Sequence, residues 1–159
     1  MAKKKSIPAG SFDRLALKHM LIGWWGLLIF LSLGILLEVL HGLKLDLYLD
    51  VRNETRRLMW TLAHAHGALF SLVHLGFAWS LTFAARWRDA PGPGFRAASP
   101  AFTGGIVLMP LGFFLGGVWI YDGDPGIGIL LVPVGALLML FGTLRVVMSV
   151  WALRAETVK

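Results

Sequence analysis

Three of the chain's five histidines lie in one apolar stretch, from residue 56 to residue 85, which is long enough to cross a bilayer. They are His64, His66 and His74. Ionisable side chains are costly at membrane depth, so those found there mark a candidate functional site. Glu38 and His41 lie near the end of the preceding apolar stretch, three residues apart and therefore on one helix face.

If the two stretches are consecutive membrane helices, Glu38, His41 and His64 share one depth in the outer half of the membrane. Glu-x-x-His on a bundle helix is a metal-binding spacing, and neutral imidazole binds iron, copper and zinc. These residues therefore predict a transition-metal site, or a haem with His41 and His64 as axial ligands, in a redox or electron-transfer role. His66 and His74 complete the set of candidate ligands.

The second stretch also carries a stripe of small and polar residues at helical spacing: His64, Gly67, Ser71, His74 and Ala78. His66 points nearly opposite to His64 on a helix, so His-Ala-His does not chelate one ion. We expect one of these two histidines to face the first helix. The other then faces the third helix, the fourth helix or another subunit.

Two other interpretations use the same residues. Histidine and glutamate inside membranes also serve as proton or ion relays. Alternatively, the histidines only pair helices, and the protein is a non-enzymatic accessory or structural subunit. No nucleophile triad, phosphate loop or dinucleotide fingerprint is present, so the sequence does not identify catalytic residues or decide whether the protein is an enzyme. His19, beside Lys18 at the inner interface, is expected to face lipid.

The elements that must position these residues follow from composition. The 159-residue chain is 57% hydrophobic, its apolar residues form four long blocks, and it has no cysteine. Backbone in lipid must satisfy its own hydrogen bonds, which a helix does within one segment. The sequence therefore predicts an all-α integral membrane protein, an antiparallel bundle of four transmembrane helices in one domain spanning residues 1–159. The expected helices cover about 15–43, 56–85, 102–121 and 127–153.

The connections carry their own signals. Residues 43–52 alternate apolar and polar, which predicts an extended segment along the membrane surface, or alternatively a short edge strand. Asn53 is the expected N-cap of the second helix. Residues 86–101 read as a solvated loop in which Ser99 and Pro100 start the third helix as N-cap and N1. The Asp-Gly-Asp-Pro-Gly run at 122–126 predicts a tight turn.

Lys and Arg cluster before the first helix, after the second and at the chain's end, whereas the turn at 122–126 has only acids. Both termini are therefore expected on the cytoplasmic side of a bacterial inner membrane. The net charge of +6 is explained by lipid headgroups, and nucleic acid is not an expected partner. A close-packing face, Gly112, Gly116 and Gly117, predicts contact with the fourth helix, with a second copy or with other membrane subunits.

Overall fold

Four long helices make up most of the computed structural model, which describes residues 10–49 and 54–157. The elements in chain order are α1 (Ser11–Gly42), α2 (Thr55–Ala84), α3 (Pro93–Val118), β1 (Ile120–Tyr121), β2 (Asp124–Pro125), the 3₁₀ helix η1 (Ile127–Leu130) and α4 (Leu131–Thr157). Each of the four predicted helices is present and is long and apolar enough to cross a membrane. The most apolar 18-residue segment of each helix has a mean hydropathy of 2.3, 1.4, 1.8 and 2.4, in chain order.

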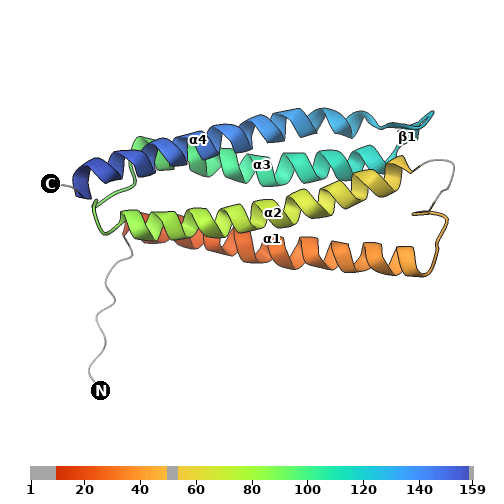
Figure 1. Cartoon of the computed structure of the whole chain (residues 1–159), viewed down its shortest axis with the longest axis horizontal. Helices are drawn as coiled ribbons and strands as arrows, with labels where there is room; N and C mark the ends of the chain where they lie inside the picture. Colours follow the sequence, from red (N-terminus) through yellow and green to blue (C-terminus); the bar gives the residue numbers. More distant parts are fainter. Residues whose placement is uncertain (1–9, 50–53, 158–159) are drawn as a thin grey trace, which may run out of the picture.

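The helices lie side by side, and the first and last described residues lie at the same end of the molecule (Figure 1). α1 packs on α2, α2 on α3 and α3 on α4. The two outer helices therefore bury little of their surface. In the apolar segments of α1 and α4, 17% of the residues are buried inside the protein, against 44% in α2 and 50% in α3. α2 and α3 form the centre, and α1 and α4 expose most of their apolar surface.

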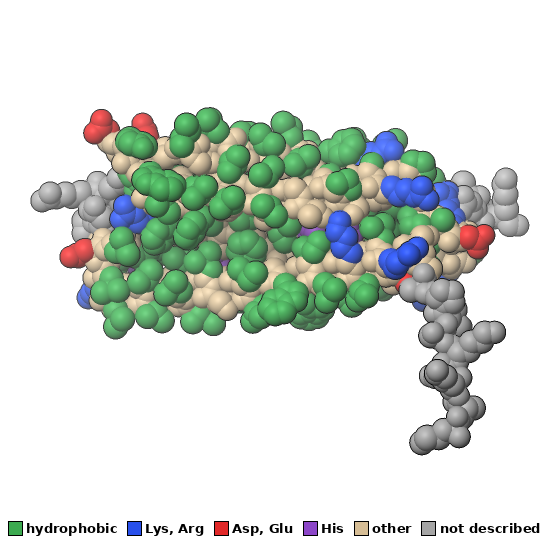
Figure 2. All heavy atoms as spheres, turned by 180° about the vertical axis from the view of Figure 1, so that it is seen from behind, with side chains coloured by type: hydrophobic (Ala, Val, Ile, Leu, Met, Phe, Trp, Pro, Cys, Tyr) green, Lys and Arg blue, Asp and Glu red, His purple; other side chains and the backbone are tan. Residues whose placement is uncertain are grey.

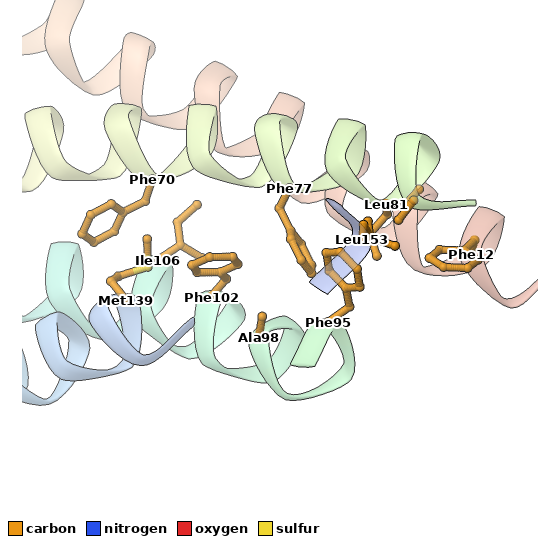
Figure 3. Packing of buried hydrophobic residues seen from close by; sticks show 12 residues of the cluster. Phe12, Phe70, Phe77, Leu81, Phe95, Ala98, Phe102, Ile106, Met139 and Leu153 are labelled. Atoms are coloured by element: carbon orange, nitrogen blue, oxygen red, sulfur yellow. The ribbon is translucent and has the colours of Figure 1, made fainter. Parts of the chain in front are cut away.

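The main core lies toward the end where the described chain begins and ends (Figure 3). Phe70, Phe77 and Leu81 of α2 face Phe95 and Phe102 of α3, and all five are buried. The cluster also takes in Phe12 and Ala16 of α1 and Met139 and Leu153 of α4. All four helices therefore contribute to one core at this end.

The third helix begins nine residues earlier than predicted, because Pro93 and not Pro100 occupies its start. Gly92 is the N-cap, with extended backbone (φ −66°, ψ 170°), and Pro93 supplies the fixed φ that suits N1. Pro100 and Pro110 both lie inside the helix, as prolines do where neighbouring helices support the chain. The N-cap assignment of Ser99 was wrong, and its hydroxyl has another use.

The connection after α1 is turned rather than extended. Lys44 has a left-handed φ of 52°, and the carbonyl of Leu45 accepts hydrogen bonds from the backbone N–H groups of Tyr48 and Leu49, both at 2.9 Å. The predicted extended segment is therefore wrong for residues 43–49, because turn hydrogen bonds outweigh the alternating pattern. The rest of that segment, and the predicted N-cap Asn53, lie outside the described residues. Glu54 is the N-cap residue of α2.

The connection between α3 and α4 is the tight turn that the composition predicts. β1 and β2 pair antiparallel, with Ile120 opposite Pro125. Asp122 and Gly123 form the turn at φ 48° and 95°, the left-handed conformation that Asp-Gly adopts in two-residue hairpins.

The glycine face of α3 divides between two neighbours. A Cβ at Gly112 would lie 3.0 Å from the carbonyl oxygen of Gly128 and from Cβ of Leu131, so this side packs on η1 and α4. A Cβ at Gly117 would lie 2.6 Å from the ring of Trp60, so this side packs on α2. Gly116 has Pro125 and Ile129 as its nearest neighbours.

Candidate functional site

Two fully buried histidines meet between α1 and α2. Nδ1 of His19 lies 2.8 Å from Nδ1 of His74, and neither side chain has measurable exposure. The prediction that His19 faces lipid is therefore wrong. His19 lies eight residues into α1 and His74 ten residues before the end of α2, so they are at similar depth, about 12–15 Å from the end where the described chain begins.

The pair continues into α3 through a serine. Nε2 of His19 lies 2.8 Å from Oγ of Ser99, which is 4% exposed, and Nζ of Lys18 donates to the same oxygen at 3.5 Å. Lysine only donates, so Ser99 accepts from it, and the serine's second lone pair or its hydrogen serves Nε2 of His19. Whichever imidazole holds the hydrogen between the two Nδ1 atoms, Lys18, Ser99, His19 and His74 form one hydrogen-bonded chain.

The chain ends in an open group. Nε2 of His74 is buried and has no hydrogen-bond partner within residues 10–49 and 54–157. In a neutral ring it carries the hydrogen when Nδ1 accepts from His19, and the lone pair when Nδ1 donates to His19. Phe77 stands edge-on to His19, with ring centroids 4.6 Å apart, and Phe102 lies beside His74 at 6.2 Å. An aromatic ring therefore packs against each of the two imidazoles.

Glycines allow α1 to approach α2 closely enough for this contact. A Cβ at Gly23 would lie 2.9 Å from the backbone oxygen of Ser71, and one at Gly26 would collide with the hydroxyl of Ser71. Ser71 is itself buried and donates to the carbonyl of Gly67 at 2.7 Å. The stripe of small and polar residues on α2 therefore packs against glycines of α1, which brings the two backbones together.

The half of the same helix pair that lies toward the β1–β2 turn holds a second polar region. A cavity of about 540 Å³ is lined by residues that include Glu38, His64, Tyr48 and Thr61. His64 lies over Gly34 and donates from Nδ1 to the carbonyl of Phe30 at 2.7 Å. A carbonyl only accepts, so Nδ1 holds the hydrogen and Nε2 of a neutral ring has the free lone pair.

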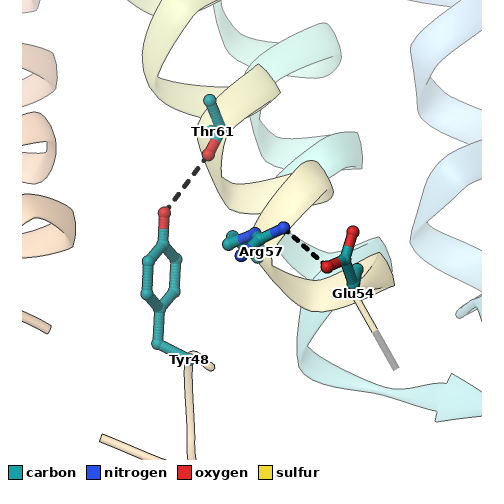
Figure 4. Close-up of polar contacts among 4 residues, drawn as sticks. All are labelled: Tyr48, Glu54, Arg57 and Thr61. Atoms are coloured by element: carbon teal, nitrogen blue, oxygen red, sulfur yellow. Dashed lines mark hydrogen bonds and ion pairs between the residues drawn. The ribbon is translucent and has the colours of Figure 1, made fainter. Parts of the chain in front are cut away.

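His41 is exposed and lines a neighbouring cavity of about 530 Å³ that shares Tyr48 and Thr61 with the first. The Tyr48 hydroxyl lies 3.3 Å from that of Thr61, and Arg57 forms an ion pair with Glu54 at 2.8 Å (Figure 4). Among the described residues, no three His, Asp or Glu side chains are grouped to hold a metal ion. Glu38, His41 and His64 therefore do not form the predicted three-ligand site.

His66 faces away from His64. Its Nδ1 donates to the carbonyl of Leu62 at 2.9 Å, and its ring lies 5.0 Å from that of Phe113 on α3. One histidine of the His-Ala-His run thus contacts α1 and the other contacts α3. His74, also a candidate ligand, belongs to the buried pair and does not line the cavity beside His64.

The sequence contains a signal for the buried pair. His19 and His74 have matching depths on the first and second helices, just as Glu38 and His64 do. Ser99 could not be found in this way, because it was assigned to a helix start.

Comparisons of the chain with models of known protein families, with curated proteins and with solved structures found no match. Function must therefore be argued from the site itself.

Proposed function

We propose that the protein is an integral membrane protein, an antiparallel bundle of four transmembrane helices with both termini on the cytoplasmic side. The apolar surfaces of α1 and α4 support this, because exposed apolar area on this scale suits lipid. On the face drawn in Figure 2, Lys and Arg gather mainly at the end where the described chain begins, as the positive-inside rule expects of the cytoplasmic end. The opposite end carries Asp122 and Asp124.

Within this membrane domain we propose proton transfer along the hydrogen-bonded chain of Lys18, Ser99, His19 and His74. The 2.8 Å contact between the two imidazoles carries the proposal. An imidazole accepts a proton at one ring nitrogen and releases one at the other, so two in series pass a proton without moving far. Lys18 is exposed and supplies the entrance, and the open Nε2 of His74 is the exit.

The outer cavity supplies the other half of the path. His64 lies on the same stripe of α2 as His74, ten residues or about 15 Å away, and shares its cavity with Glu38. Phe30 and Gly67 lie between the two polar regions. The proposed path therefore has an inner and an outer polar segment with an apolar barrier between them.

The experiment is proton flux into vesicles that contain the purified protein, driven by a potassium diffusion potential and read with an internal pH dye. We expect His74→Phe, which keeps a ring in the site, to lower the protein-dependent flux at least tenfold. His66→Phe is the matched control and should retain it. Equal flux in empty vesicles and in vesicles with the unmodified protein would refute proton transfer. The helix-pairing interpretation, in which the histidines only hold the helices together, would then remain.

A second candidate function, a haem or metal ion held at His64 in a redox role within a larger membrane complex, is favoured by one contact. Metal-bound histidines usually donate their other ring N–H to a carbonyl or carboxylate, as His64 does to Phe30. Glu38 lines the same cavity and is a candidate for a second ligand. The test is the absorbance and metal content of the purified protein. A Soret band or stoichiometric metal should be lost in His64→Ala and kept in His19→Ala.

A further inference from the structure

An apolar cavity of about 560 Å³ lies between α1 and α3, with Ala63 of α2 among its lining residues. α1 contributes Ile22, Trp25 and Ile29 to its walls, and α3 contributes Val107, Leu111 and Phe114. Most of these side chains are exposed, so the cavity opens along the molecule's surface. In a bilayer it would lie at the level of the hydrocarbon.

A second, smaller pocket of about 350 Å³ lies at the end where α1 and α3 both begin. It is lined by Ser11, Arg14 and Leu15 of α1, by Pro91, and by Arg96 of α3. Within the described ranges, neither guanidinium is paired with an acid, and both side chains are exposed. Two unneutralised arginines facing one pocket favour an anion, and the positive ends of two helices add to this.

The two pockets lie along the same faces of the same helices. Eleven residues separate Arg14 from Trp25 on α1, and eleven separate Arg96 from Val107 on α3. Eleven residues are close to three full helical turns, about 16 Å of rise. Each arginine therefore lies on the same helix face as the cavity residue eleven positions after it. Between the pockets, Lys18 reaches from α1 to Ser99 of α3. The pockets are thus the two ends of one seam between α1 and α3, which we call the α1–α3 seam.

We infer that the α1–α3 seam binds an anionic phospholipid, with its phosphate between Arg14 and Arg96 and an acyl chain in the apolar cavity. Guanidinium groups bind phosphate with two parallel hydrogen bonds, and the apolar walls of the cavity suit an acyl chain. A free phosphate would leave the apolar cavity unfilled. A second copy of the chain would bring its own arginines against these two. The inference rests on the proposed membrane insertion and is independent of proton transfer.

The test is lipid binding to the delipidated protein in detergent, followed by native mass spectrometry. The probes are phosphatidylglycerol, phosphatidylcholine and inorganic phosphate. We expect phosphatidylglycerol to bind at least tenfold more tightly than phosphatidylcholine. Arg14→Gln with Arg96→Gln should weaken it by about fivefold per arginine, the usual contribution of a basic residue near an anionic surface. Arg86→Gln, at the same end but outside the pocket, is the control and should change binding less than twofold.

The apolar half of the seam needs its own variant. Val107→Trp fills the cavity and should weaken phosphatidylglycerol binding at least fivefold. Val147→Trp on α4 is matched to it in exposure, 57% against 54%, and should have no effect. Equal binding of both lipids, or an equal loss in Arg86→Gln, would overturn the inference. So would displacement by millimolar inorganic phosphate together with full binding in Val107→Trp, because that pattern defines a small-anion site. Protein that stays soluble without detergent would instead refute the membrane insertion.

Discussion

The ring of Phe30 on α1 lies directly on the backbone of Gly67 on α2, so closely that a Cβ at position 67 would overlap the ring. This contact lies between His74, toward the end where the described chain begins, and His64, toward the end that carries the β1–β2 turn. It fills the space between α1 and α2 at the level between their two polar regions. The same contact thus has a packing role and, if protons pass along α2, a blocking role.

The packing role predicts that Gly67→Ala destabilises the protein. The added methyl group displaces Phe30, and overpacking of this kind costs about 1–3 kcal/mol. Gly76→Ala on the same helix is the control, because a Cβ there meets nothing within 4 Å. It should be neutral or stabilising by up to about 1 kcal/mol, from helix propensity. The measurement is the free energy of unfolding in mixed detergent. A neutral Gly67→Ala would contradict the close contact.

The blocking role predicts that Phe30→Ala raises proton flux at least tenfold in the vesicle assay. Removing the ring leaves space for water between the segments that end at His74 and His64. Phe83→Ala is the control, since Phe83 is 44% exposed and lies beyond the buried pair. An unchanged rate in folded Phe30→Ala would show that the two polar regions are not parts of one path.

The buried pair predicts a stability cost for His74→Ala. This change leaves Nδ1 of His19 without a partner in a site closed to water, which costs about 1–3 kcal/mol before any cavity is counted. His41→Ala removes an exposed side chain and should change the free energy of unfolding by less than about 0.5 kcal/mol. Similar costs for the two variants would mean that the imidazole contact adds nothing to the fold.

Ser99 makes a parallel prediction on α3. Ser99→Ala removes the group that both His19 and Lys18 contact, leaves Nε2 of His19 unpaired and should cost about 1–3 kcal/mol. Ser80→Ala is the comparison, because the hydroxyl of Ser80 bonds only to the Gly76 carbonyl of its own helix. We expect Ser80→Ala to cost less than about 1 kcal/mol. An equal loss in the two variants would show that Ser99 serves only its own helix.

The proposed topology predicts that tags at residues 1 and 159 are both protected in sealed right-side-out vesicles and both cut in inverted ones. A site placed at Gly123, in the turn between β1 and β2, should show the reverse pattern. The measurement is protease digestion followed by detection of each tag. Termini that are cut on opposite sides would exclude a four-crossing bundle.

The sequence by itself determined the number and type of the long elements. Four apolar blocks, too long for strands, leave helices as the only way to satisfy the backbone in lipid, and the structure has four such helices. Asp122 and Gly123 predicted their turn for an equally local reason, since few residue pairs adopt its left-handed backbone. The helix start predicted at Ser99 and Pro100 was wrong, because Pro93, seven residues earlier, also suits the first turn of a helix.

Only the tertiary structure decided which polar residues meet. His19 and His74 are 55 residues apart, and their contact depends on how α1 rotates about its axis against α2. In the observed rotation Gly23 and Gly26 of α1 lie against Ser71 of α2, where a Cβ on either glycine would be too close to Ser71. The helical repeat predicts which residues share a face of a helix. It does not predict which face a neighbouring helix covers. For this reason the sequence placed His19 toward lipid, whereas packing placed it in the interior beside His74 and Ser99.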